Sequence, residues 1–230
     1  MNITDIVNKT YFLTKTNSSS FPSADMLILI NNALERVHSL IDTADGRWQF
    51  DDNNQTDLPI ATTALVADQQ DYSLANSHLR ITRVEVKDES GNWRLLKAMD
   101  EEDVSDTAMS EFEETSGVPV YYDKLGISVF LYPKPSYSQA ASLKIYYDRG
   151  PALYTSGEVT TGTKQPGFNS LYHDLIPLWV SYEYAFANGL PTANKFLEEI
   201  NRKEDMLVKD FSSRSKDDRV IITPKPINFI

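Results

Sequence analysis

The sequence contains no cysteine, only three histidines and no long apolar run. Without cysteine it has no disulfide, no thiolate for zinc and no thiol nucleophile. The longest apolar run, Met26–Ile30, falls well short of the about 20 residues that cross a bilayer. The first residues lack the basic stretch that opens a secretory signal. We therefore expect no metal, no cofactor and no membrane association.

Positive charge is also scarce, since 22 Lys and Arg stand against 33 Asp and Glu, which gives a net charge of −11. Generic duplex-DNA binding needs clustered Lys and Arg, so this excess of acid argues against it. Carboxylates gather at Asp100–Asp103 and Glu111–Glu114. Their spacing fits neither a glycosidase pair nor a calcium loop, and we interpret them as a solvated acidic face or a subunit contact.

Apolar residues recur at helical spacing near both ends of the chain. The pattern predicts helices over Ile3–Lys15, from Ser23 to Asp45, and over Thr192–Ser212. A further helix begins at about Asn169, and Pro177 predicts either a kink in it or an effective start. The outer side of the last helix is expected to be polar and exposed: Glu198, Glu199, Arg202, Lys203, Glu204 and Asp205.

The middle of the chain, from Trp48 to Arg149, alternates apolar and polar residues with the period of a strand. The predicted strands are Ala61–Val66, Asp71–Leu74, Ile81–Lys87, Trp93–Leu96, Val118–Tyr122, Ile127–Tyr132 and Ser142–Asp148. Asp100–Glu114 is expected to be a short helix plus loop, and Thr155–Gly167 a loop rich in Gly and Thr.

These elements predict an α+β fold with segregated layers. N- and C-terminal helices form a bundle from residues 1–47 and 168–213, and an antiparallel β module, 48–167, is inserted between them. Residues 214–230 form an extended C-terminal tail, because Pro224 and Pro226 prevent a long helix there.

Histidine offers little chemistry in this sequence. His173 and Asp174 are the only adjacent His–carboxylate pair, and neighbouring helical residues do not share a face. A hydrolase built on His173 would need a distant carboxylate in a concave pocket. We interpret His38 as a rim residue of the second helix and His78 as a loop residue. Gly157–Lys164 lacks the spacing of a phosphate-binding loop.

Tyrosines occur as neighbours in strands at Tyr121–Tyr122 and Tyr146–Tyr147. Adjacent strand residues point to opposite faces, so we expect one tyrosine of each pair in the core and one at the surface. Exposed rings among Trp93, Tyr121, Tyr132 and Tyr147 would line a carbohydrate- or receptor-binding groove, which is the alternative function for this module.

The tail combines apolar side chains that it cannot bury alone with a local excess of positive charge. The apolar residues are Val220, Ile221, Ile222, Ile227, Phe229 and Ile230, and the basic ones are Arg214, Lys216, Arg219 and Lys225. Such a tail can add a strand to another chain or enter a groove. Packing on its own domain, or disorder, stays open as the alternative.

Several segments together resemble the head–tail connector (neck or adaptor) virion proteins of tailed bacteriophages. They are Ile3–Asn8, Asn31–Arg36, Gly117–Tyr122, Ile127–Pro135, Leu143–Arg149, His173–Ile176, Tyr182–Ala185, Asn188–Pro191 and the charged helix up to Asp218. The large β module departs from the small all-helical adaptors of this kind. The matching residues are structural and carry no catalytic signature.

The resemblance implies a non-enzymatic structural protein that forms a ring of twelve subunits in the virion neck, after assembly in the host cytoplasm. Its partners would be the portal protein on one side and a tail or further neck protein on the other. Genomic DNA would pass through the ring without specific binding. The tail residues Arg214, Lys216, Arg219, Lys225, Phe229 and Ile230 would contact the portal.

Overall fold

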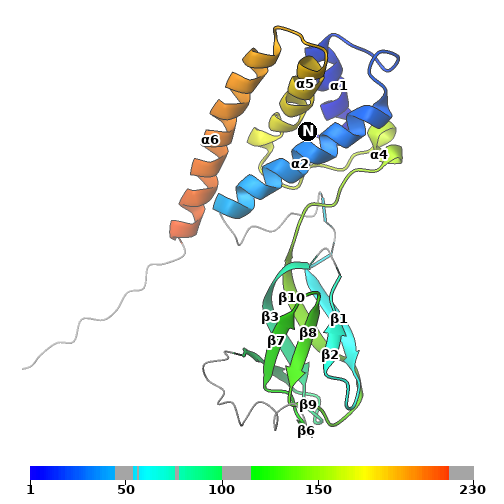
Figure 1. Ribbon diagram of the computed structural model, residues 1–230, viewed down its shortest axis with the longest axis vertical. Coiled ribbons are helices and arrows are strands. Elements are labelled where there is room, and N and C mark those ends of the chain that lie inside the picture. Colours follow the sequence, from blue (N-terminus) through cyan, green and yellow to red (C-terminus); the bar gives the residue numbers. More distant parts are fainter. Residues whose placement is uncertain (45–53, 56, 76–77, 100–114, 218–230) are drawn as a thin grey trace, which may run out of the picture. The chain divides into compact units, whose positions relative to one another are not determined.

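The computed structural model describes residues 1–44, 54–55, 57–75, 78–99 and 115–217. The chain divides into two compact units (Figure 1). The helical unit comprises residues 1–56 and 151–230, and the β unit comprises residues 57–150. Each unit has its own apolar core. The predicted α+β class, with terminal helices packed together and β-sheets inserted between them, is confirmed.

The helical unit contains α1 (Ile3–Thr14), α2 (Ser23–Ala44), α4 (Ser156–Thr161), the short 3₁₀ helix η2 (Ser170–Tyr172), α5 (Leu175–Ala187) and α6 (Ala193–Asp217). In Figure 1, α5 lies between α1 and α6, and α2 crosses them. The two N-terminal helices match their predicted spans closely. One apolar stripe of α2 is fully buried, and its members are Met26, Ile30, Leu34, Val37 and Ile41.

Local signals fix both ends of α5. Pro177 is the third helical residue, where the backbone needs no donor, so the predicted effective start is confirmed. At the other end Gly189 has φ +62°, which glycine adopts without strain. The Leu190 N–H donates to the Ala185 carbonyl at 2.8 Å, and the Gly189 N–H donates to Phe186 at 3.1 Å. This pair of bonds is a Schellman motif.

Two elements of the helical unit differ from expectation. Residues 156–161, predicted as loop, form α4, which contacts α1 and contributes Val159 to the helical core. The last helix continues to Asp217 and thus passes the expected end at Ser212. Arg214 and Lys216 therefore belong to α6 and not to an extended tail.

The described residues of the β unit form two four-stranded sheets and one short strand pair. The first sheet has the order β1 (Ile60–Leu65), β10 (Gln139–Arg149), β3 (His78–Lys87), β4 (Trp93–Leu95). The second has the order β2 (Asp71–Ser73), β8 (Ser128–Tyr132), β7 (Tyr121–Leu125), β5 (Lys97–Ala98). The third pairs β6 (Ser116–Gly117) with β9 (Lys134–Pro135).

Pairing is antiparallel wherever strands are long, as predicted, but β5–β7 and β6–β9 are short parallel pairs. The two larger sheets share one core, to which the first contributes Val84, Val86, Leu143 and Ile145 and the second Val129 and Leu131. His78, expected in a loop, is the first residue of β3. The expected helix and loop over Asp100–Glu114 lie outside the described residues.

Candidate interaction surfaces

His173 lies at the centre of a buried polar contact in the helical unit and is only 1% exposed. The amine of Met1 donates to its Nδ1 at 2.7 Å, and its Nε2 lies 2.8 Å from the Phe168 carbonyl oxygen. These partners fit the neutral ring with its hydrogen on Nε2. Because both nitrogens are engaged with the chain itself, the ring holds the fold together and is not available as a catalytic base.

Asp174 points to different partners from its neighbour His173. Its carboxylate lies 2.5 Å from Lys9 Nζ and 3.6 Å from Lys203 Nζ, so it joins α1 to α6. Partial burial raises the pKa of Asp174, but the Lys9 hydrogen bond and the charges of Lys9 and Lys203 outweigh it, and the net pKa is lowered. The predicted pair is therefore two separate structural contacts. The hydrolase hypothesis has no support in this geometry.

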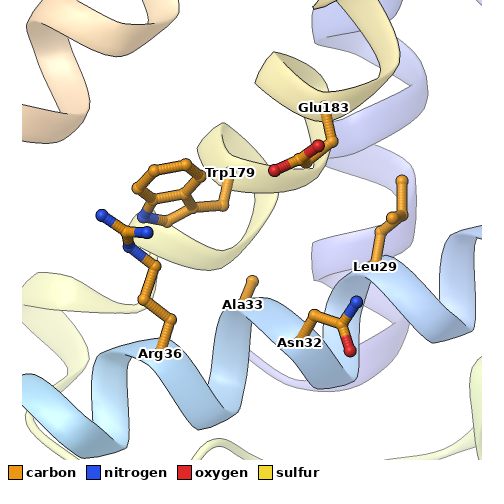
Figure 2. Close-up of a pocket in the computed structure, with 6 residues that line it drawn as sticks. All are labelled: Leu29, Asn32, Ala33, Arg36, Trp179 and Glu183. Atoms are coloured by element: carbon orange, nitrogen blue, oxygen red, sulfur yellow. The ribbon is translucent and has the colours of Figure 1, made fainter. Parts of the chain in front are cut away.

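An open pocket of about 300 Å³ lies between α2 and α5. Figure 2 shows the residues that line it: Leu29, Asn32, Ala33, Arg36, Trp179 and Glu183. The Arg36 guanidinium stacks on the Trp179 ring, 3.8 Å from its centroid. Glu204 of α6 accepts from Arg36 Nε at 3.2 Å and from Trp179 Nε1 at 2.9 Å. One carboxylate thus connects three helices.

The side chains around this pocket hold the helices together and do not form a reaction site. Its aromatic wall is already covered by Arg36, and that cation is already paired with Glu204. No nucleophile–base pair converges in it, as acyl or phosphoryl transfer would need. Its rim is polar and exposed, with Asn32 and Glu183.

A second, smaller pocket lies where α1 ends and α6 begins. Leu13, Tyr184, Leu190, Pro191 and Phe196 give it a mostly apolar wall. Next to it Phe12 is 69% exposed, with Lys15 Nζ 4.1 Å from its ring centroid. This end of the helical unit presents apolar side chains that the described part of the chain leaves uncovered.

The aromatic groove expected in the β unit does not form from the predicted residues. Tyr132 is only 4% exposed, while Tyr121 and Tyr147 are half-buried. Trp93 is exposed to 38%, but two ammonium groups, Lys87 and Lys144, lie over its ring. The carbohydrate-binding alternative therefore loses the exposed tyrosine face that it required.

The tyrosine pairs fit the expected division into core and surface members only in part. Both rings of each pair are half-buried, and of the four only Tyr122 packs against the β core. In β10 the register with β3 shifts between Tyr146 and Tyr147, so a β-bulge interrupts the alternation that the prediction assumed.

The predicted portal-side residues divide between α6 and the part of the chain outside the described residues. Arg214 and Lys216 lie in the last turns of α6, and their side chains are not among those described. Arg219, Lys225, Phe229 and Ile230 lie beyond the described range, as do the acidic clusters Asp100–Asp103 and Glu111–Glu114. Their roles stay predictions.

Among the described side chains, neither His38 nor the carboxylates offer a centre for a metal. His38 is half-buried, as expected for a residue at the rim of the buried face of α2. Burial lowers its pKa, although the charges of Asp42 and Glu35 oppose the change. Within the described ranges no three His, Asp or Glu side chains gather in a way that would hold a metal ion. Nor does any described helix combine the length and apolarity needed to cross a bilayer.

Comparison with known proteins gives one result. A family model described as SU10 adaptor protein matches residues 1–219. A search of the curated proteins found no match. The matched range includes the helical unit up to the end of α6 and the whole β unit, so the inserted sheets belong to the family pattern.

Proposed function

The chain belongs to the SU10 adaptor protein family, a family of phage head–tail adaptors, and we propose that it forms a ring between the portal and the tail of a tailed bacteriophage. The observation that carries this proposal is the family match over residues 1–219, which spans both units. Membership of a structural adaptor family implies a role without turnover. The absence of a converging catalytic group in either described pocket is consistent with that role.

In the proposed assembly, twelve copies bind head to tail around a central channel in the virion neck, after assembly in the host cytoplasm. A heterologous contact between identical subunits closes into a ring when its rotation closes. The portal binds on one side, and a tail or further neck protein on the other. Genomic DNA passes through without specific binding, because a net charge of −11 per copy repels it.

The portal contact is proposed at the C-terminal end of α6 and the residues that follow. The residues concerned are Arg214, Lys216, Arg219, Lys225, Phe229 and Ile230. The long helix supports this assignment, since its 25 residues extend about 37 Å at 1.5 Å per residue. Phe211 is the last residue of α6 in the helical core, and the helix continues about 9 Å beyond it to Asp217, so Arg214 and Lys216 lie in the part of the helix that follows the core.

The test is the mass of the complex that the purified protein forms alone and with a portal. We expect a ring with the portal, and loss of that complex when residues 214–230 are deleted while the helical circular dichroism signal survives. The charge reversal Lys195→Glu at the other end of α6 serves as the control and leaves docking intact. Unchanged docking of the truncated chain would contradict the assigned contact, and failure of the full chain to form a ring would contradict the function.

A further inference from the structure

The outward face of the first sheet carries a compact group of aromatic and basic side chains. The strand register places Arg83, Glu85 and Lys87 of β3 beside Lys144 and Tyr146 of β10, and places Trp93 and Leu95 of β4 on the other flank. The alternate residues of β3 and β10, such as Val84 and Ile145, fill the core instead. We call the seven outward residues the basic–aromatic face.

Its charges are arranged around one buried carboxylate. Glu85 is 8% exposed and lies 2.5 Å from Arg83, 4.0 Å from Lys144 Nζ and 3.3 Å from the Tyr146 hydroxyl. One carboxylate cannot balance three cations, so the face keeps an excess of two positive charges. The whole chain has a net charge of −11, so this positive excess is local, and no second carboxylate among the seven residues of the face neutralises it.

The same face exposes the side-chain types that concentrate binding energy in protein interfaces. Trp93 is 38% and Leu95 57% exposed. Lys144 Nζ lies 4.0 Å and Lys87 Nζ 5.0 Å from the Trp93 ring centroid, so two cations are held over an exposed indole. Trp, Tyr and Arg are enriched among residues whose loss weakens an interface most.

One segment of the same chain carries concentrated negative charge that could complement the positive charge of this face. Residues 100–114 contain eight Asp and Glu and no Lys or Arg. The rest of residues 57–150 holds nine Lys and Arg against eight Asp and Glu, so the acidity of the β unit comes from this one segment. We propose that the basic–aromatic face binds the acidic segment 100–114 of a second copy of this chain.

The described residues that flank the segment belong to the second sheet and to the short strand pair, and not to the first sheet. On one side of the segment, the Met99 N–H donates to the Tyr122 carbonyl of β7 at 2.8 Å, so the chain leaves from the second sheet. On the other side it enters β6, which pairs with β9. The basic–aromatic face lies across the shared core, on the outside of the first sheet. In the proposed ring of head-to-tail copies, the face of one copy and the acidic segment of the next belong to the two different surfaces that such a contact joins.

This inference rests on the proposed ring and adds a subunit contact to it. Because the contact joins two different surfaces, it is heterologous and propagates from copy to copy until the ring closes. Its electrostatic part weakens as salt is added, since ions screen charges that are partly exposed.

The test measures self-association of the full-length chain by sedimentation velocity, with and without portal, at low and high salt. The charge reversal Lys87→Glu with Lys144→Glu should weaken association about tenfold or more, and Trp93→Ala should weaken it without changing the charge. Lys124→Glu, an exposed lysine of the second sheet, is the matched control and should leave association unchanged. Circular dichroism confirms that each variant is folded.

A second reversal decides which acids are bound. Adding Glu101→Lys and Glu102→Lys to the Lys87→Glu, Lys144→Glu chain should restore association. If the face variants form rings like those of the wild type, this inference is wrong and the proposed function still stands. The same holds if the charge reversal changes only the folding of the monomer and not its association. Failure of the wild type to form rings at all would remove the proposed function as well.

Discussion

At the scale of single residues, Glu204 shows how far a helical pattern can be misread. The sequence predicted it on the exposed side of the last helix, beside Glu199 and Arg202. In the structure only the latter two form an exposed pair, 2.6 Å apart. Glu204 instead lies between Arg36 and Trp179, with its side chain 13% exposed. Periodicity identifies faces of one helix, but it contains no information on which other helices pack there.

The ionic contacts of Asp174 make stability depend on pH. Its pKa is lowered in the folded protein, so its contribution is complete above the ordinary pKa of 3.8 and is lost as pH falls through the lower folded value. Asp174→Asn should cost about 0.5–1 kcal/mol at pH 7, a modest value because the carboxylate is partly exposed. Urea unfolding at pH 7 and near pH 2 measures the difference, which should be smaller at the lower pH.

The control for this experiment is Asp205→Asn, which removes the same charge at an exposed site on α6. It should leave the free energy of unfolding nearly unchanged at both pH values. A cost for Asp174→Asn that stays constant down to pH 2 would show that the ionic contacts to Lys9 and Lys203 are not its origin.

At the scale of elements, long periodic segments were predictable and short ones were not. Helices α1 and α2 and most strands follow from their spacing alone, because a full stripe or face is buried. Helix α4 has six residues and is rich in Thr and Gly, which are weak helix formers. Thr155 and Glu158 were its one signal, since this spacing is that of a capping box. The Glu158 carboxylate indeed accepts from the Thr155 N–H at 2.7 Å.

Two glycines at this helix should respond oppositely to alanine. A methyl group on Gly162 would collide with the Glu158 carbonyl and with Ile3, so Gly162→Ala should destabilise the protein by about 1–3 kcal/mol. A methyl group on Gly157 meets only open space, so Gly157→Ala should be neutral or stabilise by up to about 1 kcal/mol. Thermal or urea unfolding of the two variants provides the comparison, and equal effects would argue against close packing of α4 on α1.

At the scale of the whole molecule, the sequence predicted the fold class, and the resemblance predicted the family. Surfaces such as the basic–aromatic face were not foreseen, because they depend on strand register, which sets Lys144 beside Trp93 across three strands. The predicted groove failed for a related reason. Alternation assigned rings to faces, but the bulge at Tyr146–Tyr147 and the burial of Tyr132 changed that assignment.

The two separate cores predict separate effects of core mutations. Leu131 is fully buried in the β core, and Leu131→Ala should cost that unit about 2–5 kcal/mol. Hydrogen exchange should then rise in the β unit and stay unchanged in α2 and α5. Ile30→Ala, in the helical core, is the reciprocal control. Faster exchange throughout the chain from either variant would show that the units unfold as one.

The β unit begins and ends at neighbouring points. Ile60 of β1 lies opposite Tyr146 of β10, and just outside this pair Arg149 Nη1 lies 2.9 Å from the Asp57 carboxylate. A second bond runs from Arg149 to the Asp57 carbonyl oxygen. Because its two ends lie together, the β unit is joined to the rest of the chain at two neighbouring positions, so a chain without residues 57–150 would need only a short linker to connect residues 56 and 151.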